Sequence, residues 1–172
     1  LAKFLPKTGW WGMRASINFE QLFQGIADLI PPSKAQVRAM LPVVQASLAM
    51  KLGFPYESLV KGFTGHAVIG MDILSAMEAR LPGKAGNLQV LLTLGVKDTA
   101  AADQVIQKLV EIAANASKGR LQASPVKLLG GTGFQWQMGP LSPVLIRIGQ
   151  TVFVASGVKT IEEAVARSSG DN

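Results

Sequence analysis

The sequence predicts an α+β domain in which helices pack on one face of a mostly antiparallel sheet. Strand-like apolar segments come in adjacent pairs joined by short turns, which favours antiparallel pairing over a parallel doubly wound sheet. A strand followed by a helix also recurs three times. Hydrophobic residues make up 48% of the 172 residues and charged residues only 16%, which excludes intrinsic disorder. We expect one domain over residues 1–172, taken from a longer chain.

The elements follow from hydrophobic periodicity and from capping residues. Asn18, Ser33 and Asp98 each precede a helical pattern and are predicted N-caps, and Thr160 with Glu163 forms a predicted capping box. The predicted strands span residues 10–17, 66–73, 88–96, 126–129, 134–138, 144–148 and 151–154. Five helices are predicted: one after Asn18, one after Ser33, one over residues 55–61, one from Asp98 to about Ser117, and one after Thr160.

Proline and glycine mark the interruptions of this pattern. Pro42 should kink the helix that follows Ser33, because proline removes a backbone donor, and Gly53 should end it. Gly149 and Gln150 separate two apolar segments, and glycine in first place suits a type II′ hairpin turn.

One short sequence occurs twice at a transition from strand to helix. Residues 95–98 are Gly-Val-Lys-Asp and residues 157–160 are Gly-Val-Lys-Thr. An internal strand–helix duplication and shared capping chemistry explain the repeat equally well.

The charge and residue content exclude several classes of site. The chain has 17 basic and 11 acidic residues, a net charge of +6 that suggests acidic partners. The basic residues come singly and aromatics are only 6%, so we expect no nucleic-acid binding. The absence of cysteine and the presence of one histidine exclude thiolate and multi-histidine metal sites, and no cofactor is expected. No uncharged apolar run approaches the roughly 18 residues of a membrane helix.

Motifs that resemble catalytic signatures are incomplete. Ser58 and Lys61 match the Ser-x-x-Lys of penicillin-binding proteins, but the Lys-Thr-Gly at residues 7–9 precedes the serine instead of following it. His66 is a candidate general base, but it is alone, and Asp72 lies about 20 Å along the same strand. We therefore expect no catalytic residues and no enzymatic activity.

Four aromatic residues form the expected contact surface. Trp10 and Trp11 are adjacent on a strand and should point to opposite faces, so one is expected in the core and one at the surface. Exposed tryptophan is typical of contact surfaces, and Phe134 and Trp136 complete the candidate set. The alternative is that these side chains are covered by helices.

Part of the chain resembles a known family. The segments that carry the resemblance are residues 57–59, 63–70, 91–102, the closing hairpin and 157–164. Over residues 56–166 the chain resembles a family of uncharacterised bacterial cell-envelope proteins, often lipoproteins or signal-anchored. The resemblance implies an extracytoplasmic, non-enzymatic domain of the envelope or periplasm with no assigned active residues. His66 stands where that family commonly has an acidic residue.

The sequence therefore leaves three functions, in order of preference. The first is a non-enzymatic binding or scaffolding domain that acts through contacts with an unknown protein partner. The second is a carrier for a lipid or other apolar ligand in a cavity between sheet and helices. The third is a serine hydrolase-like enzyme using Ser58 and Lys61.

Overall fold

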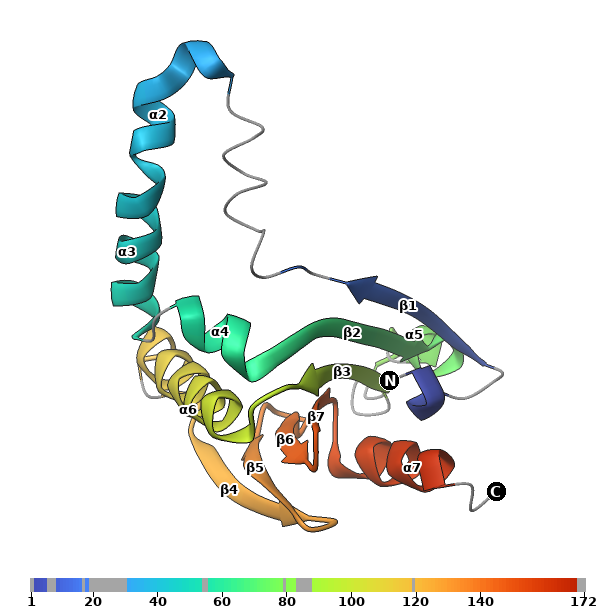
Figure 1. The fold of residues 1–172 in the computed structure, drawn as a ribbon. Coiled ribbons are helices and arrows are strands. Elements are labelled where there is room, and N and C mark those ends of the chain that lie inside the picture. Colours follow the sequence, from blue (N-terminus) through green and yellow to red (C-terminus); the bar gives the residue numbers. More distant parts are fainter. Residues whose placement is uncertain are drawn as a thin grey trace.

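The computed structural model describes residues 2–5, 9–16, 18, 31–53, 56–78, 80–82, 88–118 and 120–169. Its centre is a seven-stranded sheet in the order β1-β2-β3-β7-β6-β5-β4, with every neighbouring pair antiparallel (Figure 1). The strands are β1 (Trp10–Ser16), β2 (Phe63–Asp72), β3 (Val90–Val96), β4 (Ala123–Leu128), β5 (Gly131–Trp136), β6 (Val144–Ile148) and β7 (Thr151–Ala155). The predicted α+β class and antiparallel sheet are confirmed.

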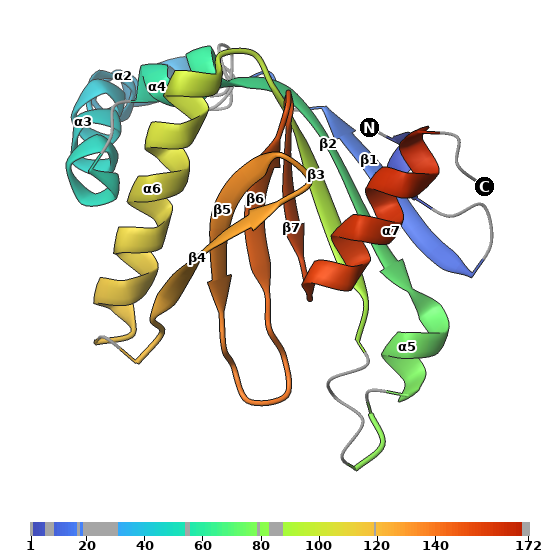
Figure 2. The same cartoon turned by 90° about the horizontal axis from the view of Figure 1, so that it is seen from below.

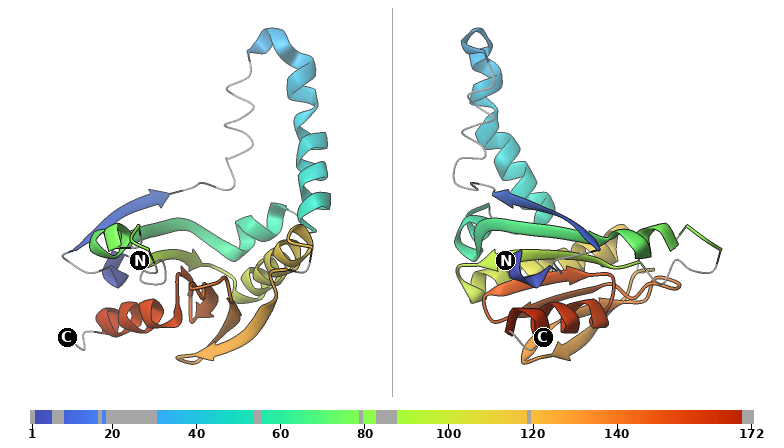
Figure 3. Two further views of the ribbon diagram at one scale, coloured as in Figure 1. Left: turned by 180° about the vertical axis from the view of Figure 1, so that it is seen from behind. Right: turned by 90° about the vertical axis from the view of Figure 1, so that its right-hand side faces the viewer.

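Six α-helices and two 3-10 turns lie within the described residues. The helices are α2 (Ala35–Ala39), α3 (Leu41–Leu52), α4 (Tyr56–Gly62), α5 (Ile73–Glu78), α6 (Thr99–Ala116) and α7 (Val158–Ser169), and the 3-10 turns are η1 (Ala2–Phe4) and η2 (Pro32–Lys34). Helices α2 and α3 project away from the sheet as an arm (Figures 1 and 3). None of the helices described is long and apolar enough to cross a membrane.

The helices α6 and α7 lie on opposite faces of the sheet (Figure 2). Along β6, Val144 and Ile146 belong to the cluster that α7 covers, and Leu145 between them belongs to the cluster under α6. The expectation that the helices pack on one face is therefore wrong in this respect. The physical reason lies in the central strands, because a strand that is apolar at consecutive positions needs cover on both of its faces.

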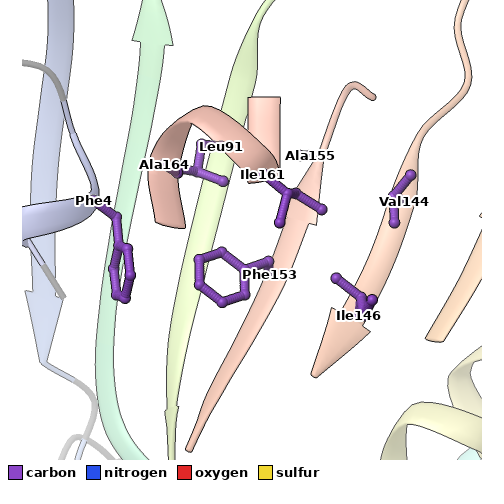
Figure 4. Packing of buried hydrophobic residues seen from close by; sticks show 8 residues of the cluster. All are labelled: Phe4, Leu91, Val144, Ile146, Phe153, Ala155, Ile161 and Ala164. Atoms are coloured by element: carbon purple, nitrogen blue, oxygen red, sulfur yellow. The ribbon is translucent and has the colours of Figure 1, made fainter. Parts of the chain in front are cut away.

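The core on the α7 face joins the first residues of the chain to the last helix. The ring of Phe4 in η1 meets the ring of Phe153 edge-on, with centroids 5.0 Å apart (Figure 4). Arg167 in α7 donates a hydrogen bond from Nη2 to the Phe4 carbonyl oxygen at 3.2 Å. Burial in this contact lowers the pKa of Arg167. The buried members of this core are Phe4, Leu91, Val144, Ile146, Phe153, Ala155, Ile161 and Ala164.

The core on the other face lies under α4 and α6. Gly62 at the end of α4 lies against the α6 backbone, where a Cβ would come within 3.0 Å of the Ala102 nitrogen. The close approach of these two helices thus depends on a residue without a side chain. The buried members of this core are Phe63, Val96, Ala102, Val105, Ile106, Leu145 and Val152.

Several local predictions are confirmed. The Asp98 carboxylate accepts hydrogen bonds from the backbone nitrogens of Ala100 and Ala101 at 2.9 and 3.1 Å, and so caps α6. Pro42 lies in the first turn of α3, directly after the break between α2 and α3. Gly53 ends α3 with a left-handed φ of 68°, and Gly149 opens the β6–β7 turn with a φ of 56°.

Two predicted caps are wrong, and the helix predicted to follow a third lies outside the described residues. Ser33 is inside η2, and the N-cap there is Pro31. The final helix α7 begins at Val158, so Thr160 is inside its first turn and is buried. Burial of Thr160 and Ile161 against the sheet, and not a capping box, decides where α7 begins. The helix predicted after Asn18 falls on residues 19–30, outside the described part.

The repeated Gly-Val-Lys sequence marks different structural positions. Strands β1-β2-β3 followed by α6 resemble β5-β6-β7 followed by α7, with β3 and β7 adjacent. However, Val96 is the last residue of β3, whereas Val158 is the first residue of α7. Helices α6 and α7 also pack on opposite faces of the sheet. The repeat is therefore one of strand order and not of equivalent strand–helix junctions.

Candidate functional site

The two adjacent tryptophans point to opposite faces, as predicted. Trp10 packs against the core on the α7 face, and Trp11 is 51% exposed. Phe134 and Trp136 lie on β5, which four strands separate from β1, and both pack against the α6-face core. The indole nitrogen of Trp136 is buried and has no hydrogen-bond partner in the part of the chain that the structure describes. The four aromatic residues therefore do not form one surface.

The exposed tryptophan belongs to a different apolar surface, on the α6 face of β1 and β2. Trp11 stands opposite Met71, and Met13 stands opposite Ile69. Residues directly opposite in a ladder share a face, so these four residues form one patch, which we call the β1 surface. Met13, like Trp11, is 51% exposed. Sequence reasoning missed Met13, although its position two residues after Trp11 on a strand places both on one face.

Two further exposed apolar side chains lie on α5, which follows β2, and one of them, Leu74, lines a cleft near the start of α7. Strand β2 leads directly into α5, where Leu74 is 67% and Met77 is 64% exposed. The Asp72 carboxylate caps this short helix by accepting from the Leu74 backbone nitrogen at 2.9 Å. Exposed apolar side chains scattered singly are normal, but a group of them at one end of a sheet is typical of an interaction surface.

The two edges of the sheet differ in how well they are protected. Strand β4 carries Pro125 and Lys127, and proline and lysine are residues that prevent edge strands from pairing with other chains. Strand β1 contains no proline, and Arg14 is its one charged residue. Among the described strands none pairs with the outer edge of β1. The backbone groups on that edge are therefore a template for another strand.

Ser58 and Lys61 lie on α4, one helical turn apart. Ser58 is partly buried and Lys61 is exposed, and within the described residues no hydrogen bond joins them. Nothing in this arrangement activates the hydroxyl as a nucleophile, since such activation needs a base within hydrogen-bond reach.

His66 lies in an open cleft of about 760 Å³ on the α7 face, beyond η1. Its ring Nδ1 is 3.2 Å from the hydroxyl oxygen of Ser16 on β1, and its backbone nitrogen donates to the Thr64 hydroxyl at 3.3 Å. Lys3 and Arg14 also line the cleft. Sequence analysis singled out His66 but not these two cations, because the sheet brings them together from separate segments.

A smaller cleft of about 420 Å³ lies near the start of α7. Asp72, Glu78 and Lys159 are among the residues that line it. Asp72 and His66 thus belong to different clefts, which agrees with the expectation that they are not a catalytic pair. Across the residues that the structure describes, no group of three or more histidine, aspartate or glutamate side chains is placed to hold a metal ion.

No family model, curated protein or solved structure matches the chain. The similarity of residues 56–166 to bacterial envelope proteins therefore stays an expectation from the sequence.

Proposed function

We propose that this chain is a non-enzymatic binding and scaffolding domain of the bacterial cell envelope that acts through protein–protein contacts. The binding surface in this proposal is the outer edge of β1 together with the β1 surface beside it. One observation carries the proposal: the outer edge of β1, with which no other described strand pairs, belongs to the strand that carries exposed Trp11 and Met13. The envelope location rests on the resemblance of residues 56–166.

Addition of a strand would satisfy two needs of this edge at once. Backbone groups on the outer side of β1 would gain partners from the added strand, as in other cases of strand addition. Alternate side chains of the added strand would pack against Trp11 and Met13 and remove their apolar surface from water. The partner in this proposal is therefore an extended, apolar segment of a polypeptide.

A second copy of β1 meets these requirements. In an antiparallel pairing centred on Met13, Arg14 of one copy stands opposite Gly12 of the other, so the two like charges do not face each other. Trp11 stands opposite Ala15 in this register, where the small side chain leaves room for the indole. Self-association is therefore one expected form of the contact.

The alternatives draw less support from the described residues. A carrier for an apolar ligand needs an apolar cavity between sheet and helices, but the larger cleft carries Lys3 and Arg14 and the smaller one Asp72 and Glu78. The hydrolase hypothesis needs an activated serine, and within the described chain no hydrogen bond joins Ser58 to Lys61.

Site-specific photo-crosslinking tests the proposal. A benzophenone amino acid is placed at position 11 and, as a control, at position 109, because Leu109 on α6 is similarly exposed at 43%. We expect discrete protein adducts from position 11 in extracts of the source cell, at twice the mass of the chain or with another protein, and none from position 109. The same adducts from both positions, or none from position 11, would overturn the proposal.

A further inference from the structure

We infer that the cleft beside His66 binds the phosphate group of a phosphorylated ligand. The inference is independent of the proposed strand addition, since the cleft lies on the α7 face and the β1 surface lies on the α6 face. It rests on three features of the cleft. These are an irregularity in β2 that forms one wall, a set of cationic and donor groups with no acidic residue among the described lining residues, and apolar groups in the lining.

An irregularity in β2 forms one wall of the cleft. Phe63 pairs with Val96 and Ala67 pairs with Leu94, so three residues of β2 lie opposite one residue of β3. The two extra residues are accommodated at Gly65, which has a left-handed φ of 78°. Bulges of this kind redirect side chains and are common beside functional sites. Here Thr64 and His66, on either side of Gly65, both line the cleft.

The polar groups of the cleft suit an anion. Lys3 comes from η1 and Arg14 from β1, and neither forms an ion pair within the described residues. None of the described residues that line the cleft is acidic. Two cations that have no carboxylate partner among the described residues leave a net positive charge in a concave place, which attracts anions. The hydroxyl, amide and imidazole groups beside them come from Ser16, Thr64, His66 and Gln150.

The number and type of these groups favour phosphate. A phosphate group offers three strong acceptor oxygens, and a planar guanidinium can donate to two of them at once. The ammonium of Lys3 and the hydroxyls of Ser16 and Thr64 also line the cleft and are further donors.

Apolar groups also line the cleft. Val68 is one of them and is only 4% exposed. Gly95 in β3 also lines the cleft, and a Cβ there would overlap the Thr64 side chain. Since the cleft has the volume typical of small-molecule sites, the ligand is a phosphate ester with a small apolar body. A soluble ester such as glycerol phosphate and the headgroup of a phosphatidate lipid share this chemistry.

The single histidine provides a direct test. The chain has one His, so its two imidazole C–H resonances in a proton NMR spectrum, of which the Hε1 resonance is followed, report on the cleft. We expect inorganic phosphate and glycerol 3-phosphate to shift this resonance saturably at constant pH and ionic strength, with chloride as the reference anion. Absence of a saturable shift with both, together with no binding to phosphatidate vesicles, would overturn the inference.

Two binding measurements distinguish a soluble phosphate ester from a lipid headgroup as the ligand. Saturable binding of glycerol 3-phosphate in solution supports a soluble ester. Binding to vesicles with phosphatidate, but not to vesicles of phosphatidylcholine alone, with no response to soluble esters, supports a lipid headgroup. Either result supports phosphate recognition.

A matched pair of variants separates a site from general surface charge. Arg14→Gln removes the guanidinium in the cleft, and Arg120→Gln removes an exposed one far along the chain that does not line it. We expect Arg14→Gln to weaken binding at least about tenfold, since a charge-assisted contact is lost. Arg120→Gln should leave the affinity within about twofold, as expected for a remote charge screened by salt. Equal losses in both variants would overturn the inference. Because both residues are exposed, the fold is retained.

Discussion

Arg147 on β6 and Asp103 on α6 form a two-pronged ion pair, with Nε 2.6 Å from Oδ1 and Nη2 2.7 Å from Oδ2. Nη1 of Arg147 also donates to the Gly149 carbonyl oxygen at 3.1 Å. The pair thus joins the long helix on one face to the β6–β7 turn. The hydrogen bonds with Asp103 raise the pKa of Arg147. Two parallel hydrogen bonds fix the angle between the groups as well as their distance.

Removing this pair should lower stability modestly. We expect Asp103→Asn to reduce the free energy of unfolding by about 1 kcal/mol, because the carboxylate is half exposed and solvent screens the pair. Because the pKa of Arg147 is raised in the folded protein, its contribution to the free energy of unfolding is fully present below the ordinary guanidinium pKa. That contribution is lost only when the pH rises above it. The loss should therefore be equal at roughly pH 6 and pH 9. Urea denaturation measures it.

The exposed pair of Lys108 and Glu111 is the matched control for this measurement. It is an i,i+3 contact within α6 and joins no other element. Lys108→Gln should change the free energy of unfolding by no more than about 0.5 kcal/mol. An equal loss in both variants would show that the Arg147 pair contributes nothing beyond a surface contact.

The turn between β4 and β5 contains a strained residue. Leu128 pairs with Gly131, so Leu129 and Gly130 form a two-residue loop, with φ values of 50° and 74°. Two left-handed residues make a type I′ turn, for which Asn-Gly is strongly preferred. We expect Leu129→Asn to stabilise the protein by about 0.5–1 kcal/mol, since asparagine tolerates this conformation and the leucine side chain is half exposed. Thermal denaturation measures the change; a lower melting temperature would contradict this turn geometry.

The cap of α6 gives a prediction with an internal control. Asp98→Ala removes the acceptor for the Ala100 and Ala101 nitrogens and should cost about 1 kcal/mol. Asp98→Asn keeps an acceptor oxygen in the same place and should cost much less. Chemical denaturation of both variants distinguishes the cap from the charge: equal losses would mean that the negative charge at the helix start, and not the hydrogen bonds, stabilises α6.

Features that depend on neighbouring residues could be predicted from the sequence. The Asp98 cap, the Gly149 turn and the opposite faces of Trp10 and Trp11 all follow from local rules. The predicted start of α7 was wrong because burial of Thr160 against the sheet overrode the local capping pattern. The prediction also missed that helices cover both faces of the sheet, although the consecutive apolar residues of β6 indicate this.

The cleft beside His66 could not be predicted, because its parts are far apart in the sequence. Lys3, Arg14 and Gln150 line the same cleft as His66 only because η1 packs on the α7 face of the sheet and β7 pairs with β3. The extra residues in β2 become visible only once the register with β3 is known, since Gly65 alone does not reveal a bulge.

The last prediction concerns the edge of β1. Met13→Lys places a charge on the β1 surface, and charges on an edge strand oppose the addition of another strand. We expect this variant to reduce the yield of adducts from a crosslinker at position 11 by about tenfold, as for loss of a central contact residue. The control is Val43→Lys on α3, which adds the same charge at a side chain that is 61% exposed on the projecting arm. Both substitutions are at exposed positions, so circular dichroism should show an unchanged fold. A reduced yield with Met13→Lys alone assigns the contact to β1, whereas equal yields in both variants would mean that the partner binds elsewhere and that Trp11 is merely near it.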